Sequence, residues 1–432
     1  MAIIAPFQAW RYHPGRVPVA KVVTQPYDKI APEMQDRYYA ANPHNLVRLV
    51  LGKRLPGDGD RDNVYTRAAA DFSHWRSSGI VAQDPQPSLY RYSQTFTIGP
   101  DSKTPAERQG YIALGRLEDY SAGVVFRHEL THSKPKADRL DLLRATRAHF
   151  EQIFMLYSGA PEIDTLLYSG APPDIEVTDE YGVVHRVWKI SDPSVIQAVQ
   201  AAMQNQKLII ADGHHRYETA LTYRDERRAA APGATAAPYD SMMMTFFNMD
   251  SPGLVILPTH RVVFDLPSFS ASQLQAGARQ FFNVEELDAG IDASRAATVL
   301  SQAGRAGTAL IAATRDRVFL MHTAKAMGSN RFAGLSLRQQ SLDVVQLHKC
   351  LLEGVLNISE EAIRQLRNIS YHRDAEEALG LVRSGSSQAA FLMNPVSMQQ
   401  MRDIAFAGEV MPQKSTDFYP KLLSGLTIYA MD

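Results

Sequence analysis

The sequence has almost no cysteine and no long apolar run. Cys350 is the single cysteine among 432 residues, so no disulfide can form within the chain. Its place in an apolar helical pattern predicts a small buried side chain and not a nucleophile. No stretch reaches the roughly 18 apolar residues of a membrane span, and the N-terminus lacks the regions of a secretory signal. We therefore expect a soluble, cytoplasmic protein without a membrane partner.

The sequence also lacks an excess of either charge. Lys and Arg together number 45, Asp and Glu 46, and the formal net charge is −1. Proteins that bind nucleic acid mainly through its phosphates usually carry a basic excess, so a nucleic-acid partner is not expected. Hydrophobic residues make up 45% of the chain, an ordinary globular share. The composition does not indicate an oligomeric state.

Strand-like and helix-like segments are interspersed along the chain, which predicts an α+β protein of two domains. We expect an N-terminal α+β region over 1–264 and a C-terminal α+β domain over 265–432, whose last segment could return to the functional pocket. Two helices are predicted with particular apolar faces. One, 136–154, follows from KADRLDLLRATRAHFEQIF. The other follows from VYTRAAADFSHWRSSG, which ends at a glycine and turns these residues inward: Val64, Ala68, Phe72 and Trp75.

The motif H-E-x-x-H, formed by His128, Glu129 and His132, suggests a zinc metalloprotease. Such a site needs two uninterrupted helical turns, so that both histidines face one metal. Pro135 follows three residues after His132, and the preceding AGVVF favours a strand. No convincing third ligand follows. We therefore disfavour the metalloprotease hypothesis and expect no zinc, while His128 and Glu129 remain candidates for other chemistry.

The stretch KLIIADGHHRYETAL combines several features of an anion site. An apolar strand runs into a tight Asp212-Gly213 turn, and a helix is expected to begin at about His214. The first N–H groups of a helix lack internal partners and lie at its positive end, and glycine permits close backbone approach. His214, His215 and Arg216 add cationic donors where only an anion makes them favourable. The alternative is a capped helix whose histidines satisfy local backbone groups.

These features predict a phosphate site in which Asp212 is either the helix N-cap or a Mg²⁺ ligand. Further candidates for the same chemistry surround the start of the helix predicted over 136–154. Glu129 is the candidate base, with His128 beside it, because phosphoryl transfer needs a carboxylate that orients the nucleophile. Asp138 and Arg139 are either pocket residues or a structural ion pair. The early motif QPYDKI adds two pocket candidates, Tyr27 and Asp28.

Two later motifs carry the remaining candidates for phosphate binding. LPTHRVV places His260 and Arg261 inside an apolar run, which indicates either a sheet end near the pocket or an exposed turn. MPQKSTDFYPK offers Lys414, Ser415 and Thr416, which could close over phosphates. The motif lacks the glycines of a phosphate-binding P-loop, and the alternative is a C-terminal arm that packs through its aromatic residues.

A family resemblance covers essentially the whole chain. IIADGHHRYETAL resembles the signature of the bacterial and archaeal family called domain of unknown function 1015. Other blocks of that family follow in the same order: APFQAWR, QPYDKI, NPHNLVRL, HELT with ADRLDLL, LPTHRVV, LDVVQLH, ISYHRD and MPQKSTDFYPKLLSGL.

The block D-G-H-H-R is also similar to the phosphate-binding turn of the ParB/sulfiredoxin-like superfamily, which includes partition proteins, sulfiredoxins and free-serine kinases. This resemblance implies a ParB/sulfiredoxin-like nucleotide-binding core, to which mixed α/β elements and the C-terminal domain are added. It also implies phosphate and metal contacts at Asp212, His214, His215 and Arg216.

The resulting hypothesis is a phosphotransferase that uses ATP or ADP with Mg²⁺ and acts on a small hydroxyl-bearing metabolite. By superfamily analogy the named substrate is free serine. The alternative is a nucleotide-binding regulator of the ParB type, either non-catalytic or nucleotide-hydrolysing. No basic helix-turn-helix supports DNA binding in that alternative.

Overall fold

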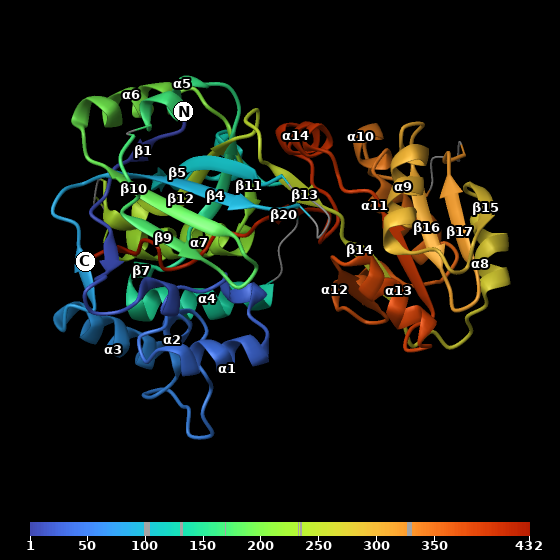
Figure 1. The fold of residues 1–432 in the computed structure, drawn as a ribbon, viewed down its shortest axis with the longest axis horizontal. Helices are drawn as coiled ribbons and strands as arrows, with labels where there is room; N and C mark the ends of the chain where they lie inside the picture. The colour runs from blue at the N-terminus through green and yellow to red at the C-terminus, as the bar shows by residue number, and fades with distance from the viewer. Residues whose placement is uncertain (99–103, 130–132, 169, 232, 234–235, 326–330) are drawn as a thin grey trace. The chain divides into compact units, whose positions relative to one another are not determined.

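The computed structural model describes residues 1–98, 104–129, 133–168, 170–231, 233, 236–325 and 331–432. The chain forms two compact units (Figure 1). Unit 1 comprises Met1–Arg127, Thr131–Leu254 and Pro420–Asp432, and unit 2 comprises His128–Leu130 and Val255–Tyr419. Whether 1–264 and 265–432 fold as separate domains stays a prediction.

Unit 1 is built on a large mixed sheet. Its strands follow the order β6-β11-β8-β12-β5-β4-β10-β9, with β1 beside β5, and the described residues contribute nine strands. The pairs β6–β11 and β8–β12 are parallel and the others are antiparallel. The strands are β1 (Ile4–Ala5), β4 (Leu89–Phe96), β5 (Ala106–Arg116), β6 (Val125–Phe126), β8 (Ile153–Tyr157), β9 (Ile175–Thr178), β10 (Val184–Ile190), β11 (Leu208–Asp212) and β12 (Ser241–Asn248).

Helices cover both faces of this sheet (Figure 1). On one side lie α5 (Glu162–Leu166) and α6 (Pro193–Met203), which pack against the apolar side chains of the sheet. On the other lie α1 (Pro32–Ala41), α2 (Val47–Val50), α3 (Val64–Ser77) and α4 (Ser133–Thr146), and α7 (His214–Ala230) packs on α4. Shorter elements complete the unit: η1 (Val19–Lys21), η2 (Tyr27–Lys29), η3 (Tyr120–Ala122), η4 (Pro238–Asp240), and the pairs β2 (Trp10–Tyr12) with β3 (Val81–Gln83) and β7 (Ala148–His149) with β21 (Tyr429–Ala430).

The helix α3 confirms the pattern read from its sequence. All four predicted core residues of this helix are buried. Asn63 caps its start by accepting hydrogen bonds from the N–H groups of Tyr65 and Thr66. The stop at Gly79 is also explained, because this glycine has a left-handed φ of 72°.

The predicted helix 136–154 is wrong in its second half. The helix α4 ends at Thr146, Arg147 turns left-handed with φ 48°, and β7 and β8 follow. The apolar residues at its end suit a helix and a buried strand equally, since short apolar runs are ambiguous. Pairing of β8 with β11 and β12 on its two sides decides in favour of the strand.

Unit 2 is a six-stranded antiparallel sheet with helices, counted over the described residues. The order is β15-β17-β16-β19-β14-β18. Its strands are β14 (His260–Val263), β15 (Asn283–Leu287), β16 (Ala309–Ala313), β17 (Val318–His322), β18 (Ile369–His372) and β19 (Ala389–Met393), and a separate pair joins β13 (Val255–Leu257) to β20 (Asp417–Tyr419). Its helices are α8 (Ala271–Ala278), α9 (Ala293–Gly304), α10 (Leu337–Gln340), α11 (Asp343–Gln346), η5 (Leu347–Leu352), α12 (Glu360–Arg364), α13 (Ala375–Arg383) and α14 (Met398–Phe406).

The single cysteine behaves as predicted. Cys350 lies in η5, is fully buried and is unbridged. Burial raises the pKa of its thiol to about 11, so the nucleophilic thiolate is disfavoured at neutral pH. None of the helices within the described ranges is both long and apolar enough to span a bilayer.

Candidate functional site

The strand β11 delivers Asp212 to the start of α7. Gly213 lies between them with a left-handed φ of 92° and is the N-cap of the helix. A Cβ at this glycine would lie 2.9 Å from Cδ1 of Ile153 and 3.0 Å from Nη2 of Arg216. Both the backbone conformation and the space therefore require glycine here. The predicted helix start at His214 is confirmed.

The carboxylate of Asp212 lies between two cations. Lys421 Nζ is 3.2 Å from its Oδ1, and Arg216 Nη2 is 3.1 Å from its Oδ2. Burial alone would raise the pKa of Asp212, but Lys421, Arg216 and Lys29 outweigh it and hold this pKa well below the usual range. Asp212 is consequently ionised throughout the physiological pH range.

Arg216 holds the turn together. Its side chain is buried, and Nη1 donates a 2.6 Å hydrogen bond to the main-chain oxygen of Gln152 while Nη2 contacts Asp212. Burial opposes the charged form, but Glu151, Asp212 and Asp28 outweigh it and raise the pKa of Arg216. The guanidinium thus links the start of α7 to the residue before β8. Because both of its terminal nitrogens already have partners, it is less available to bind a phosphate.

Glu151 is a buried carboxyl group that the sequence patterns did not single out. It is 6% exposed, and its Oε1 accepts a 2.9 Å hydrogen bond from the N–H of Tyr27. Burial raises its pKa against the opposing effect of Arg216 and Arg139. The sequence placed Glu151 in a helix, whereas it lies between β7 and β8, so its proximity to the Asp212 turn could not be inferred.

Arg139 contacts both Tyr27 and Asp138, and Asp28 lies close enough to Arg216 to help raise its pKa. The guanidinium of Arg139 lies 4.1 Å from the ring centroid of Tyr27 and pairs with Asp138 at 2.5 Å. The ion pair that was one of the two alternatives for Asp138 and Arg139 is therefore present. A cavity of about 50 Å³ beside Glu151, Arg139 and Arg216 has room for water but not for a nucleotide.

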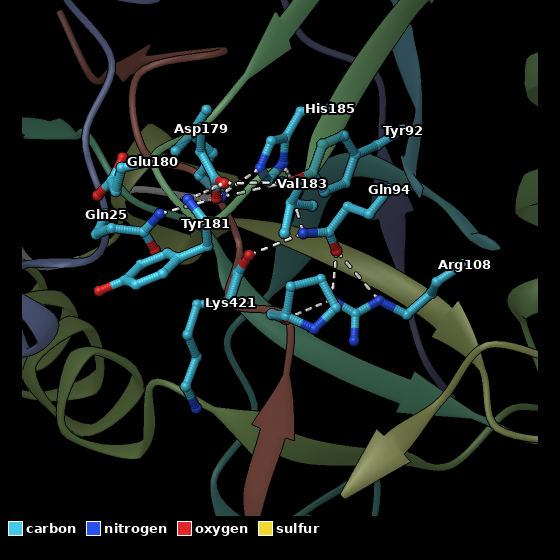
Figure 2. Close-up of polar contacts among 12 residues, drawn as sticks. Gln25, Tyr92, Gln94, Arg108, Asp179, Glu180, Tyr181, Val183, His185 and Lys421 are labelled. Carbon is cyan, nitrogen blue, oxygen red and sulfur yellow. Dashed lines mark hydrogen bonds and ion pairs between the residues drawn. The ribbon is translucent and has the colours of Figure 1, made fainter. Parts of the chain in front are cut away.

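Lys421 is the second residue missed by the sequence patterns, and its backbone is fixed by a buried pair (Figure 2). Gln94 Nε2 donates 2.8 Å to the carbonyl of Lys421, and Arg108 Nη2 donates 2.6 Å to the carbonyl of Pro420. Arg108 also donates to Oε1 of Gln94. Figure 2 shows the side chain of Lys421 extending away from this pair, and its Nζ reaches Asp212.

Arg108 is itself fully buried and packs against two aromatic rings that contact each other. Its guanidinium lies 4.6 Å and 4.7 Å from the ring centroids of Phe154 and Phe247. Burial lowers its pKa to about 9. A guanidinium over aromatic faces retains part of its stabilisation through cation–π contact. It still carries its charge at neutral pH and can hold the carbonyl of Pro420.

A buried chain of hydrogen bonds lies next to Gln94 (Figure 2). Tyr92 Oη is 2.7 Å from Nδ1 of His185, and Nε2 of His185 is 3.1 Å from Oδ2 of Asp179. Burial opposes ionisation of Asp179, but the hydrogen bond and charge of His185 and two backbone N–H groups lower its pKa. Because an ionised carboxylate can only accept, Nε2 of His185 donates to Asp179.

In unit 2, His128 and Glu129 meet the Lys414–Thr416 motif. The hydroxyl and the N–H of Thr416 each donate a 2.9 Å hydrogen bond to Oε1 of Glu129. Nε2 of His128 lies 2.7 Å from the same hydroxyl. Because that hydroxyl has one hydrogen and gives it to Glu129, Nε2 of His128 must be the donor. The three side chains form a relay from His128 through Thr416 to Glu129.

Arg261 supports the Lys414 turn from β14. Its Nη2 donates 2.9 Å to the carbonyl of Lys414, which has a left-handed φ of 55° and an exposed side chain. Ser415 donates its hydroxyl to the carbonyl of Pro412 at 2.5 Å. Burial lowers the pKa of Arg261 to about 10 and that of His260 to about 4, so His260 is neutral at physiological pH. His260 and Arg261 lie at the buried start of β14 and not in an exposed turn, while their place near the pocket stays a prediction.

A family model described as "Protein of unknown function (DUF1015)" matches residues 4–345. The chain belongs to the DUF1015 family. This confirms the family resemblance predicted from the motifs, while a ParB/sulfiredoxin-like core stays a prediction. None of the curated proteins matches this DUF1015 chain.

Several solved structures resemble this DUF1015 protein weakly. A conserved hypothetical protein from Pyrococcus furiosus is 10% identical, covers 70% of this chain and 91% of its own, and has a TM-score of 0.36. A free serine kinase in complex with AMP is 11% identical with 70% and 89% coverage and a TM-score of 0.36. SbnI with a C-terminal truncation, from Staphylococcus aureus, is 12% identical with 72% and 85% coverage and the same TM-score. Likenesses with such TM-scores carry no argument about fold or chemistry.

The predicted site residues of the DUF1015 chain fall into two groups, one in each unit. In unit 1 these are Tyr27, Asp28, Asp138, Arg139, Asp212, Gly213, His214, His215 and Arg216. In unit 2 these are His128, Glu129, His260, Arg261, Lys414, Ser415 and Thr416. His132 lies outside the described residues, and the chemical roles of all the others stay predictions.

A magnesium site at Asp212 also stays a prediction. Within the described residues no group of three His, Cys, Asp or Glu side chains could hold a metal. Mg²⁺ in phosphoryl-transfer sites needs only one or two carboxylates beside phosphate oxygens and water. Both oxygens of Asp212 already contact cations, which disfavours a further cation bound directly to it.

Proposed function

We propose that this DUF1015 protein is a nucleotide-dependent phosphotransferase that acts on a small hydroxyl-bearing metabolite, with free serine as the first substrate to test. The phosphoryl donor is a nucleoside triphosphate or diphosphate, with ATP and ADP the first choices. The observation that carries the proposal is the ionised Asp212 held between Lys421 and Arg216 at the start of α7.

The start of α7 has the properties of a phosphate-binding turn. Gly213 exposes the backbone, the first N–H groups of a 17-residue helix lie at its positive end, and His214 and His215 are half-buried beside them. Arg216 takes a different role from the one first assigned, because its guanidinium is held by Asp212 and Gln152. We therefore assign to Arg216 the role of positioning the turn. The backbone N–H groups, His214 and His215 would bind the phosphate.

Lys421 supplies the mobile positive charge in this proposal. An ammonium on a four-carbon stem can turn from Asp212 to a nearby phosphate oxygen more easily than a guanidinium fixed at both ends. Before a nucleotide binds, the ion pair with Asp212 holds Lys421 in place. Positioned cations of this kind stabilise the charge that spreads over the transferred phosphoryl group.

Magnesium would enter with the nucleotide. Because Asp212 is already engaged by two cations, the phosphate oxygens of the nucleotide would hold the ion. The proposed base is Glu129, whose carboxylate is oriented by Thr416 in unit 2. Its role is to accept the proton of the substrate hydroxyl.

The first experiment is a thermal-shift panel with ATP, ADP, CTP and GTP, each with and without Mg²⁺. We expect one nucleotide to raise the Tm of the wild type by several degrees and that of Lys421→Met much less. Arg228→Met is the matched control, since it removes an exposed cation at the far end of the same helix. No shift with any nucleotide would contradict both the phosphotransferase and the nucleotide-binding regulator.

Transfer is then measured by ³¹P NMR with serine and with a panel of small alcohols. We expect Glu129→Gln to retain the nucleotide-induced Tm shift and to lose transfer at least 100-fold. Nucleotide binding without transfer to any hydroxyl would instead favour the non-catalytic or nucleotide-hydrolysing regulator.

A further inference from the structure

Unit 2 contains a cleft of about 600 Å³ that takes no part in the proposed function. Its lining comes from residues 266–270, 273–274, 355–359, 362 and 367–368, and the predicted site residues are not among these described residues. A volume of this size is typical of small-molecule sites. The cleft is therefore large enough for a ligand of its own.

The lining has an apolar floor and a polar rim. Phe269, Val355 and Leu356 are half-buried apolar side chains of the lining. The rim carries hydroxyl and amide groups, including those of Ser359 and Asn368. Small-molecule sites typically combine these two features, an apolar body and a few polar groups that orient the ligand.

Several residues in the rim or next to it have left-handed backbone conformations. Asp265, Asn357, Leu366 and Asn368 all have left-handed φ values, between 54° and 63°. Asparagine tolerates this conformation, but a leucine adopts it only where the surrounding structure imposes it. Such strain concentrates at ligand clamps and functional loops. Leu366 is therefore the one of these four residues whose left-handed conformation the surrounding structure must impose.

Side chains brace this rim from below. Nδ2 of Asn368 donates to the carbonyls of Phe264 and Asp265 at 3.2 Å and 3.0 Å. Gln388 hydrogen-bonds both main-chain groups of Leu266, accepting from its N–H at 3.3 Å and donating to its carbonyl at 3.1 Å. The two loops that form the rim are thus fixed to each other and to the sheet, so a ligand would meet a preformed site.

Arg367 gives the cleft its charge. Among the lining residues that the structure describes it is the only ionisable side chain, and it is exposed. Across the described ranges no carboxylate forms an ion pair with it, whereas its neighbour Arg364 pairs with Glu361 at 2.8 Å. A guanidinium matches the planar fork of a carboxylate and holds it by two parallel hydrogen bonds. One such group suits a single negative charge.

We propose that this cleft is a binding site for a small amphipathic monocarboxylate. The apolar part of the ligand covers Phe269, Val355 and Leu356, and its carboxylate pairs with Arg367. The site is independent of the phosphate site proposed in unit 1.

The probe is decanoate, compared with decanol, decylamine and decyl phosphate, which share its chain and differ in charge. Binding to the full-length wild type is measured by saturation-transfer NMR and calorimetry. We expect decanoate to bind at least tenfold more tightly than decanol or decylamine, and Arg367→Gln to weaken decanoate about tenfold without affecting decanol. Arg364→Gln is the matched control and should leave all four affinities unchanged.

A second variant tests the location of the ligand. Ala362→Phe adds a ring to the cleft lining and should abolish decanoate binding while Tm changes little. The proposal is overturned if decanoate and decanol bind equally, if Arg367→Gln has no effect, or if decanoate does not bind at all. Tighter binding of decyl phosphate than of decanoate would overturn the assignment to a carboxylate.

Discussion

At the scale of single residues, Asp212 depends on Lys421, which lies 209 positions away in the chain. The pair is mostly shielded from water, and the side chain of Lys421 is only 8% exposed. Charge-assisted hydrogen bonds in such surroundings are stronger than those at the surface. Removing either partner leaves the other charge partly desolvated.

We expect Lys421→Met to lower the free energy of unfolding at pH 7 by about 1–3 kcal/mol. The lowered pKa of Asp212 contributes stability above the unfolded pKa of about 4, and this is lost as pH falls through the folded pKa. The deficit of the variant should therefore persist down to about pH 4 and shrink only as pH falls further towards the folded pKa. Urea denaturation of Lys421→Met, Asp212→Asn and the double variant at pH 7 measures the pair, and additive deficits would show that the two charges do not interact.

Asp343 has the opposite effect on the pH dependence of stability. Burial raises the pKa of its carboxyl to about 7, against the effect of hydrogen bonds from Ala309 and Thr308. The folded protein therefore binds this proton more tightly than the unfolded chain does. Stability from this group is complete below about pH 4 and is lost as pH rises towards 7.

We expect Asp343→Asn to remove that pH dependence. The variant should match the wild type near pH 4 and exceed its free energy of unfolding by about 2–4 kcal/mol at pH 8. Guanidinium denaturation over pH 4–8 tests this. A variant that is less stable than the wild type at pH 8 would mean that the ionised carboxylate is favourable where it lies.

At the scale of elements, the junction between β11 and α7 depends on one glycine. Gly213 has both a left-handed φ and close neighbours, whereas Gly79, after α3, has a φ of 72° with open space around it. Alanine substitutions at these two positions therefore distinguish the cost of backbone strain from the cost of steric overlap.

Gly79→Ala should cost about 1 kcal/mol through backbone strain alone. Gly213→Ala should cost more, because its Cβ would also displace Ile153 or Arg216, and it should abolish the nucleotide-induced Tm shift. Thermal unfolding of both variants, with and without the best nucleotide, measures the two effects. Equal losses of Tm would mean that Ile153 and Arg216 move aside at little cost.

At the scale of the molecule, the last residues of the chain are part of unit 1. The segment Pro420–Asp432 pairs β21 with β7, and Ile428 and Ser424 form further bridges with Trp10 and Thr24. The buried pair Gln94 and Arg108 holds its start. Lys421 therefore reaches Asp212 only while this segment is docked.

Arg108→Met should loosen the docked segment without unfolding the protein. The carbonyl of Pro420 loses a charged donor worth about 2 kcal/mol, so amides of Pro420–Asp432 should exchange roughly 30-fold faster. Hydrogen-exchange mass spectrometry follows this peptide, with the peptide of α3 as an internal control. Faster exchange in both peptides would indicate global destabilisation instead.

Local chemistry in the sequence was enough to determine several parts of this protein. The apolar spacing and glycine stop of α3, the strand β11 and the start of α7 were predicted correctly, because each depends on neighbours within a few residues. Family membership was also readable from the motifs and is confirmed.

Only the tertiary structure decided which groups surround Asp212. Glu151 follows a helix end that β8 pairing imposes, and Lys421 arrives through a C-terminal segment held by Gln94 and Arg108. Arg216 was recognised as part of the turn, but its buried hydrogen bonds to Gln152 and Asp212 were not. Contacts between residues 64 to 327 positions apart leave no periodic signal in one sequence, because they depend on packing and strand pairing across the whole unit.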